Sequence, residues 1–279
     1  MNKKPIEPRV YRSQFWQQAA VNFIDKQGLD AVTILAYASL VGLVPFLAIL
    51  FGVFALSDSF AVFQAEVIDK VLHFLLPEAT PQVEAYLLKF AQKAGQLQGV
   101  GIISMFAIAL ILLWTIDKKI NLMWHRHYQR RWWVSLLHYL GVSLLGPLIL
   151  GAGLVLSSLL LAAPILPDLF WMADALKQLP FFINVVGFWF LYRFVPAVKV
   201  SSRAAWVGAL LTTLELELLK FGFGVYVKWF PTYDLIYGAF AVIPLFLLWL
   251  YLLWLVIIFN ASVVRQIDLV VVKPPSQSD

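Results

Sequence analysis

The chain contains no cysteine, which excludes disulfide bonds, thiolate metal sites and a cysteine nucleophile. Charged residues are scarce as well, because they make up 13% of the 279 positions, about half the share found in a soluble domain. The sequence also has no phosphate-binding glycine loop, no HExxH motif, no nucleophile elbow and no carboxylate pair spaced for hydrolysis. We therefore expect no cofactor and no metal site.

Apolar residues fill the chain instead, at 61% of all positions with a mean hydropathy of +0.81. Such a composition leaves too few polar side chains to cover a water-soluble fold. The apolar runs are about twenty residues long and end in aromatic or charged residues, as membrane-spanning helices do. The sequence predicts an all-α fold, a polytopic bundle of six transmembrane helices over 31–56, 100–116, 134–162, 180–195, 204–221 and 239–263.

Two further helical elements are predicted outside these spans. Over 13–27, an apolar face predicts a short amphipathic helix in the membrane interface, ending near Gly28; that face holds Trp16, Ala20, Phe23 and Ile24. Between the first two spans, apolar stripes predict an extracytoplasmic helical hairpin at about 58–98. The domain organisation is then a tail and interfacial helix (1–30), a membrane domain (31–263) and a tail (264–279).

The distribution of basic residues predicts the orientation in the membrane. Of the 21 Lys and Arg residues, 15 fall in the segments that would share one side of the bundle and six fall in the others. Because Lys and Arg concentrate in cytoplasmic loops, both termini are expected in the cytoplasm. The same rule accounts for the net charge of +5 without invoking nucleic acid.

The span 204–221 carries three charged residues, Glu215, Glu217 and Lys220. Glu217 and Lys220 lie three residues apart and can pair on one helix face, whereas Glu215 points toward the opposite side. A carboxylate in hydrocarbon needs a partner, a proton or water. One interpretation is a polar pathway or proton-coupled site inside the bundle. The other is that Lys220 extends to the outer interface and Glu217 neutralises it.

A second polar group lies where 100–116 enters a basic connection and consists of Asp117, Asn121 and Trp124. Four-residue spacing puts Asp117 and Asn121 on one face, where they form either a polar site or a helix cap, and capping is favoured on spacing alone. His125 and His127 are two residues apart, so on a helix they point to different faces and are interpreted as interface anchors rather than metal ligands.

Other features have simple membrane interpretations. The Arg-Arg-Trp-Trp run at 130–133 suits anionic headgroups and the aromatic belt better than RNA, so no nucleic-acid partner is predicted. Glycine and proline interrupt several spans, as in transporters with broken binding-site helices and as in ordinary close packing. The predicted helix-break positions are Gly42, Pro45, Gly146, Pro147 and Pro244.

Four segments together resemble the YihY/BrkB family of bacterial inner-membrane proteins: LAYASLVGLVP (35–45), TIDKKINLMW (115–124), RFVPAVKV (193–200) and YDLIYGAFAVIPLFLLWLY (233–251). The resemblance covers about 35–264 and implies a six-helix protein of the inner membrane. It also implies that seven residues match recurrent family positions: Asp117, Asn121, Trp124, Glu217, Lys220, Tyr237 and Gly238. Many relatives look like Gly-Ala-Glu where this chain has Asn260, Ala261 and Ser262, so no role of that glutamate is carried over.

Three functions follow as hypotheses, in order of preference. The first is a transporter or exporter of a lipid or other amphiphile, whose partners are membrane lipids and that substrate. The second is a structural or scaffolding protein for envelope integrity. The third is the membrane-associated ribonuclease implied by the family's former ribonuclease BN-like label, which the absence of clustered acidic or histidine ligands disfavours. The oligomeric state and the substrate are left open.

Overall fold

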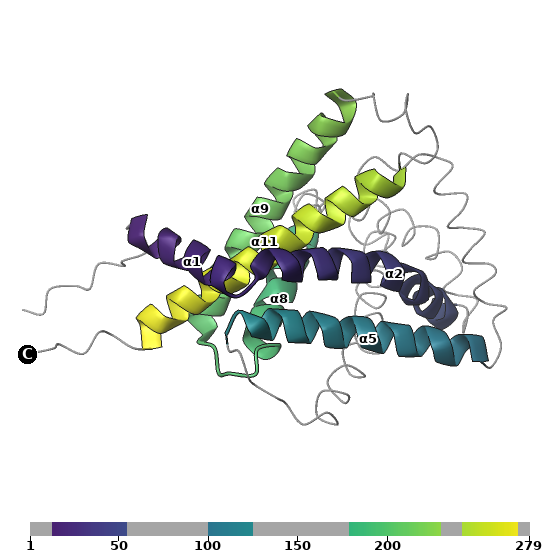
Figure 1. The fold of residues 1–279 in the computed structure, drawn as a ribbon, viewed down its shortest axis with the longest axis horizontal. Coiled ribbons are helices and arrows are strands. Elements are labelled where there is room, and N and C mark those ends of the chain that lie inside the picture. The colour runs from purple at the N-terminus through teal and green to yellow at the C-terminus, as the bar shows by residue number, and fades with distance from the viewer. Residues whose placement is uncertain (1–12, 55–99, 125–178, 230–241, 273–279) are drawn as a thin grey trace, which may run out of the picture.

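A computed structural model describes residues 13–54, 100–124, 179–229 and 242–272, and within these ranges all regular secondary structure is α-helical, with no strand (Figure 1). The helices are α1 (Ser13–Asp25), α2 (Gly28–Phe54), α5 (Val100–Leu122), α8 (Leu179–Phe194), α9 (Ser202–Trp229) and α11 (Val242–Val272). Five of the six predicted spans thus correspond to helices. The predicted span 134–162 and the hairpin at 58–98 lie outside the described residues.

Helix α11 is the element around which the others pack. It contacts α9, α2 and α1, while α8 pairs with α9 and α5 pairs with α2 (Figure 1). Within the described ranges, one stretch is both long and apolar enough to cross a bilayer, Pro244–Val270, with a mean hydropathy of 2.3 over its best window. Its 27 residues extend about 40 Å at 1.5 Å per residue. Bulky side chains on this helix, such as Trp249 and Ile258, are fully buried.

Several helices continue past the ends that hydropathy predicts. Helix α9 reaches Trp229 rather than 221, and α11 reaches Val272 rather than 263. The end of an apolar run marks where a helix leaves the hydrocarbon of the membrane. The helix itself continues beyond that point as long as one of its faces packs against the protein. The extension of α9 matters for the site below, because it moves the charged residues away from the helix end.

The junction of α1 and α2 lies where the sequence predicts a break. Gln27 adopts a left-handed backbone conformation with φ of 54°, and α2 begins at the next residue, Gly28. A Cβ on Gly28 would lie 2.4 Å from the Phe23 ring, so only glycine lets the chain turn this closely against α1. The prediction that the first helix ends near Gly28 is confirmed.

Helix α1 turns one face toward the rest of the bundle. The side chains that point inward are Phe15, Ala19, Asn22 and Phe23. Trp16 and Ile24, which belong to the apolar face predicted to lie in the membrane interface, are 40% and 67% exposed. The sequence did not indicate that α11 would accept a buried asparagine from α1.

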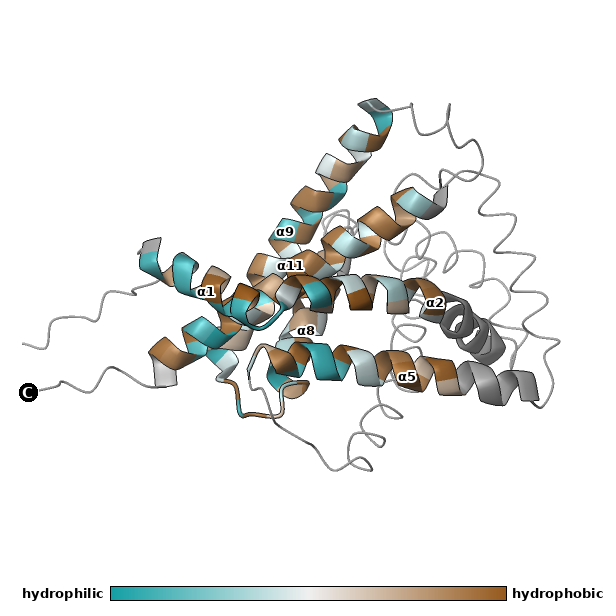
Figure 2. Ribbon diagram, in the orientation of Figure 1, coloured by the Kyte–Doolittle hydropathy of each residue, from teal (hydrophilic) through white to brown (hydrophobic). Residues whose placement is uncertain are grey.

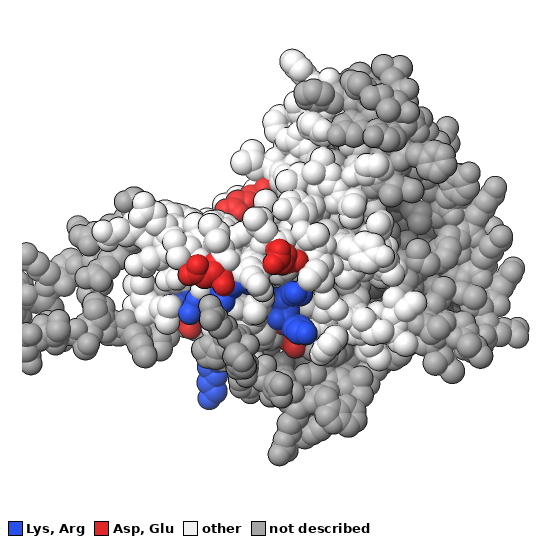
Figure 3. Space-filling model, in the orientation of Figure 1, with Lys and Arg blue, Asp and Glu red and all other residues white. Residues whose placement is uncertain are grey.

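Polar and charged groups gather at one end of the bundle, called here the polar end: the start of α2, the end of α5, the α8–α9 connection and the end of α11. Ser201, which precedes α9, donates its backbone N–H to Asp268 of α11 at 2.7 Å. Figure 2 shows hydrophilic residues concentrated where these segments meet, and Figure 3 shows charged atoms on the same part of this face. The described parts of the segments that were counted on one side of the membrane from their basic residues are thus brought together.

Candidate functional site

The charged residues of α9 lie near the middle of the helix. Glu217 is fifteen residues after Ser202 and twelve before Trp229, or about 22 Å and 18 Å from the two ends. Lys220 is followed by nine further helical residues. The position of the helix end does not decide between the two interpretations, because a helix continues beyond the point where it leaves hydrocarbon, and both a site inside the bundle and a lysine that extends to the outer interface stay predictions.

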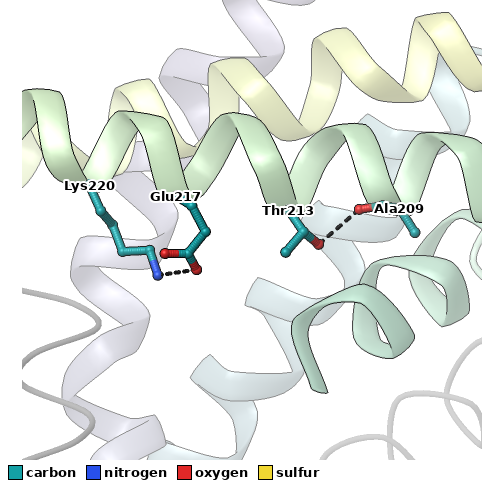
Figure 4. A network of polar contacts seen from close by, with 4 residues as sticks. All are labelled: Ala209, Thr213, Glu217 and Lys220. Atoms are coloured by element: carbon teal, nitrogen blue, oxygen red, sulfur yellow. Dashed lines mark hydrogen bonds and ion pairs between the residues drawn. The ribbon is translucent and has the colours of Figure 1, made fainter. Parts of the chain in front are cut away.

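Glu217 and Lys220 form a partly exposed ion pair on α9. Lys220 Nζ lies 2.5 Å from Glu217 Oε1, and the two side chains are 26% and 43% exposed for Lys220 and Glu217 respectively. Figure 4 shows both projecting from the side of the helix that also carries Thr213, whose hydroxyl donates to the Ala209 carbonyl. The pairing predicted from three-residue spacing is confirmed. The pair is open enough for another charged group to approach it.

An exposed apolar stripe runs along α9 beside this pair. Its members recur every three or four residues and are each at least 40% exposed: Val207, Leu210, Leu214, Leu218, Phe221, Val225 and Trp229. At 100° per residue, Glu217 lies about 40° around the helix from Phe221. We call this set the α9 stripe. Helix α9 thus presents an ion pair and a long apolar surface side by side.

On the opposite face of α9, Glu215 is held by α11. Asn260 Nδ2 donates to Glu215 Oε2 at 2.5 Å and to the Val256 carbonyl at 3.0 Å. Asn260 is fully buried and Glu215 is half-buried. The other amide atom, Asn260 Oδ1, is buried without a hydrogen-bond partner. Among the described residues, no cation pairs with Glu215.

A buried hydroxyl pair lies within one helical turn of Glu215. The Tyr192 hydroxyl lies 2.8 Å from Thr212 Oγ1 and 2.9 Å from the Ile257 carbonyl, and Thr212 Oγ1 lies 2.8 Å from the Gly208 carbonyl. Two hydroxyl protons cannot serve all three contacts at once. Together with the contact between Glu215 and Asn260, this hydroxyl pair joins α8, α9 and α11. We call the four residues the polar seam: Tyr192, Thr212, Glu215 and Asn260.

Three members of the polar seam were not predicted as site residues: Tyr192, Thr212 and Asn260. A signal for Asn260 was present, because an amide inside the strongly apolar span predicted over 239–263 needs a partner in the bundle. Nothing in the sequence indicated that this partner would be Glu215, 45 positions earlier.

Asn121 at the end of α5 joins that helix to the α8–α9 connection. Its Nδ2 donates to Asp117 Oδ1 at 2.9 Å and to the Val195 carbonyl at 3.2 Å, while its Oδ1 accepts from the Ala197 N–H at 2.6 Å. The prediction that Asp117 and Asn121 share one helix face is confirmed, whereas the choice between a polar site and a helix cap stays a prediction. Trp124 is buried beside this end. The group belongs to the polar end, about 20 Å along the bundle from Glu217 by helix rise.

Three of the predicted helix breaks lie within described helices, and the chain stays helical at each. Figure 1 shows α2 as a single bent helix, which runs uninterrupted through Gly42 and Pro45. A Cβ on Gly42 would lie 2.5 Å from Leu112 Cδ2, so this glycine permits close packing of α5. Pro244 lies in the first turn of α11, where a proline N–H is not needed. The backbone is therefore not unwound at these three positions, and Gly42 fits the alternative prediction of close helix packing. Gly146, Pro147, Tyr237 and Gly238 lie outside the described residues.

A separate polar cavity of about 440 Å³ lies between α1 and the end of α11. Amide side chains dominate its lining: Gln14, Gln17, Gln18, Asn22 and Gln266, with Asp25. In the described parts of the chain, no three His, Asp or Glu side chains group closely enough to hold a metal ion.

Comparison with known proteins gives one consistent result. Residues 19–276 match the family described as virulence factor BrkB. A UPF0761 membrane protein of Cronobacter sakazakii is 35% identical over 82% of this chain and 80% of its own length. A UPF0761 membrane protein of Pseudoalteromonas atlantica is 32% identical over 88% of this chain and 85% of its own length. One of Azotobacter vinelandii is 33% identical over 90% of this chain and only 62% of its own length. No solved structure matches the chain.

Proposed function

Because the chain belongs to the BrkB family of membrane proteins, we propose that it is a transporter or exporter of a lipid or other amphiphile. The observation that carries the proposal is the placement of the Glu217–Lys220 ion pair at the middle of α9 beside the exposed α9 stripe. An amphiphile has the same two parts, a polar headgroup and an apolar chain. Its headgroup would exchange with the ion pair while its chain lies along the stripe.

The energetics favour such an exchange at this depth. An ion pair that borders hydrocarbon on one side and a water-filled pathway on the other is only partly solvated, so a headgroup that supplies opposite charges compensates both members at once. In water the same exposed pair would contribute little, because solvent already satisfies it. A zwitterionic or anionic headgroup therefore fits the pair better than an uncharged one, since each can engage Lys220.

The proposal includes a topology. We place six membrane spans, with 134–162 among them, in the bacterial inner membrane, and an extracytoplasmic hairpin at 58–98. The polar end would face the cytoplasm together with both termini, which is supported by the basic residues that its segments share, such as Lys118, Arg193 and Arg203.

Thiol labelling tests the proposal directly, because the native chain supplies no background cysteine. Glu217→Cys is expected to react with a membrane-impermeant thiol reagent in intact vesicles and to be protected by the transported amphiphile. Lys199→Cys, exposed on the α8–α9 connection, is the aqueous control, and buried Leu216→Cys is the unreactive one. Absence of labelling at position 217 from either side, in a folded variant, would contradict the proposal.

Flux in proteoliposomes provides the second test. Transfer of fluorescent anionic or zwitterionic lipids is expected to exceed that of empty vesicles and to fall at least tenfold in Lys220→Gln. The charge exchange Glu217→Lys with Lys220→Glu preserves the pair and should retain more flux than either single change. Flux equal to empty vesicles across a panel of lipids and amphiphiles would contradict transport.

A structural role is the second candidate. It is supported by polar side chains that tie helices together, namely Asn22 to Ser262 and Asn121 to Ala197. A reproducible crosslinked protein partner, together with no labelling at Glu217→Cys, would favour it. The proposal includes no ribonuclease activity, because Glu215 and Glu217 are each engaged by a neighbouring side chain. RNA hydrolysis by the purified chain that disappears in Glu217→Gln would overturn that part.

A further inference from the structure

The fully buried amide of Asn260 lacks a hydrogen-bond donor for its oxygen. Both amide hydrogens are used, one by Glu215 Oε2 and one by the Val256 carbonyl. The oxygen, Oδ1, has no partner. A buried acceptor left unsatisfied lowers stability, and folded proteins rarely retain one without a reason.

The group best placed to supply the missing donor is Glu215. An ionised carboxylate only accepts hydrogen bonds, whereas a protonated carboxyl also has one O–H to donate. A carboxylic acid and an amide can then pair in both directions, with N–H donating to one carboxyl oxygen and the other oxygen donating to the amide carbonyl. The first half of this arrangement is present, since Asn260 Nδ2 lies 2.5 Å from Glu215 Oε2.

Among the residues that the structure describes around Glu215, no other group compensates its charge. Helix α9 packs against α8 and α11. From α8, the titratable group facing Glu215 is the Tyr192 phenol, which is already engaged by Thr212 and the Ile257 carbonyl. The α11 residue that contacts Glu215 is Asn260, which carries no charge. On α9 itself, Glu217 and Lys220 lie on the opposite face and pair with each other.

We propose that Glu215 and Asn260 form a proton-binding site at the α9–α11 interface. A hydronium ion gives up one O–H bond, a new O–H bond forms on the free carboxyl oxygen of Glu215, and water is released. The new O–H donates to Asn260 Oδ1, which makes Asn260 a positioning residue for the proton. A role of this pair in coupling proton movement to transport rests on the proposed function. The binding of a proton by the pair does not.

Infrared difference spectroscopy on the full chain in lipid nanodiscs tests the site without any substrate. Between alkaline and acidic pH, a carboxylic-acid C=O band that shifts in D₂O is expected. The band should vanish in Glu215→Gln and persist in the matched control Glu217→Gln. Asn260→Leu should retain the band but move it to the frequency of an acid without a hydrogen-bonded partner, which a merely structural role of Asn260 would not do.

Thermal unfolding at several pH values gives an independent readout. Since the folded chain would hold the proton more tightly than the unfolded chain, stability should fall as pH rises through the titration of Glu215. Glu215→Gln carries a permanent amide donor for Asn260 Oδ1, so its stability should lack this pH dependence.

The outcomes separate the two proposals. A band unaffected by Glu215→Gln, or no titration at all, overturns the proton site even if lipid flux is found. A band that titrates and depends on Glu215 supports the site, and if flux is then absent for every substrate tested, the transport proposal fails while the site stands.

Discussion

Asn22 in α1 donates a hydrogen bond to Ser262 in α11, with Nδ2 and Oγ 2.7 Å apart, although 240 positions separate the two residues. The Ser262 hydroxyl then donates to the Ala19 carbonyl at 2.8 Å. Ser262 is fully buried and Asn22 nearly so. The first helix is therefore tied into the bundle by a buried polar contact as well as by apolar packing.

Removing the Ser262 hydroxyl should destabilise the chain. Ser262→Ala leaves the buried Asn22 amide without its Ser262 partner and removes the hydrogen bond from Ser262 to the Ala19 carbonyl, at a cost of about 1–3 kcal/mol. Asn22→Leu should cost a similar amount, and the double substitution should cost less than the sum because both remove the same contact. Unfolding in detergent measures this, with exposed Gln17→Ala as the neutral control. Strict additivity would contradict a direct coupling.

Gly208 sets how closely α9 and α11 approach. A Cβ at this position would lie 2.0 Å from Val264 Cγ2. Gly208→Ala should therefore cost about 1–3 kcal/mol by overpacking. Adding Val264→Ala removes the obstructing methyl group and should recover part of that loss.

The control for Gly208 lies on the same helix. A Cβ on Gly222 meets nothing within 4 Å, so Gly222→Ala should be neutral or stabilise α9 by up to about 1 kcal/mol through helix propensity. Equal melting-temperature changes for the two glycines would contradict the packing role of Gly208.

The sequence was sufficient to predict the helical class and most helix starts, because apolar run length depends only on local composition. It could not predict how far α9 extends. Gly222 and Gly224 lower helix propensity beyond 221. The helix continues because Phe223 packs against Trp249 of α11, with ring centroids 5.1 Å apart, and such tertiary packing overrides local preference.

The candidate site likewise has a part that could be predicted from the sequence and a part that could not. The Glu217–Lys220 pair and the opposite direction of Glu215 follow from helix geometry alone, and both predictions are confirmed. The contact between Glu215 and Asn260 depends on the register of α9 against α11. That register is set by contacts such as Gly208 against Val264, which no local pattern reveals.

Asn121→Asp should destabilise the polar end in a pH-dependent way. Aspartate keeps the acceptor for the Ala197 N–H but replaces the donor to Val195 with a second carboxylate beside Asp117. The expected loss is about 1–3 kcal/mol at neutral pH, and protonation of the new carboxyl should restore a donor and recover stability as pH falls. Thermal unfolding at several pH values between acidic and neutral measures this change in stability. A pH-independent loss equal to that of Asn121→Ala would contradict the assigned hydrogen bonds.

The α9 stripe should face lipid, and two leucines two residues apart provide a matched test. Leu218 is 71% exposed and Leu216 is 4% exposed. Because the chain lacks cysteine, Leu218→Cys and Leu216→Cys can each carry a single spin label in liposomes. Oxygen concentrates in hydrocarbon, so it should relax the label at 218 strongly and a water-soluble nickel complex should not, while the label at 216 should be shielded from both. Strong relaxation by nickel at 218 would place the stripe in water, and shielding from both reagents would mean that another protein surface covers it. Either result would remove the apolar half of the amphiphile site and leave Glu217 and Lys220 without the neighbouring surface on which the transport proposal depends.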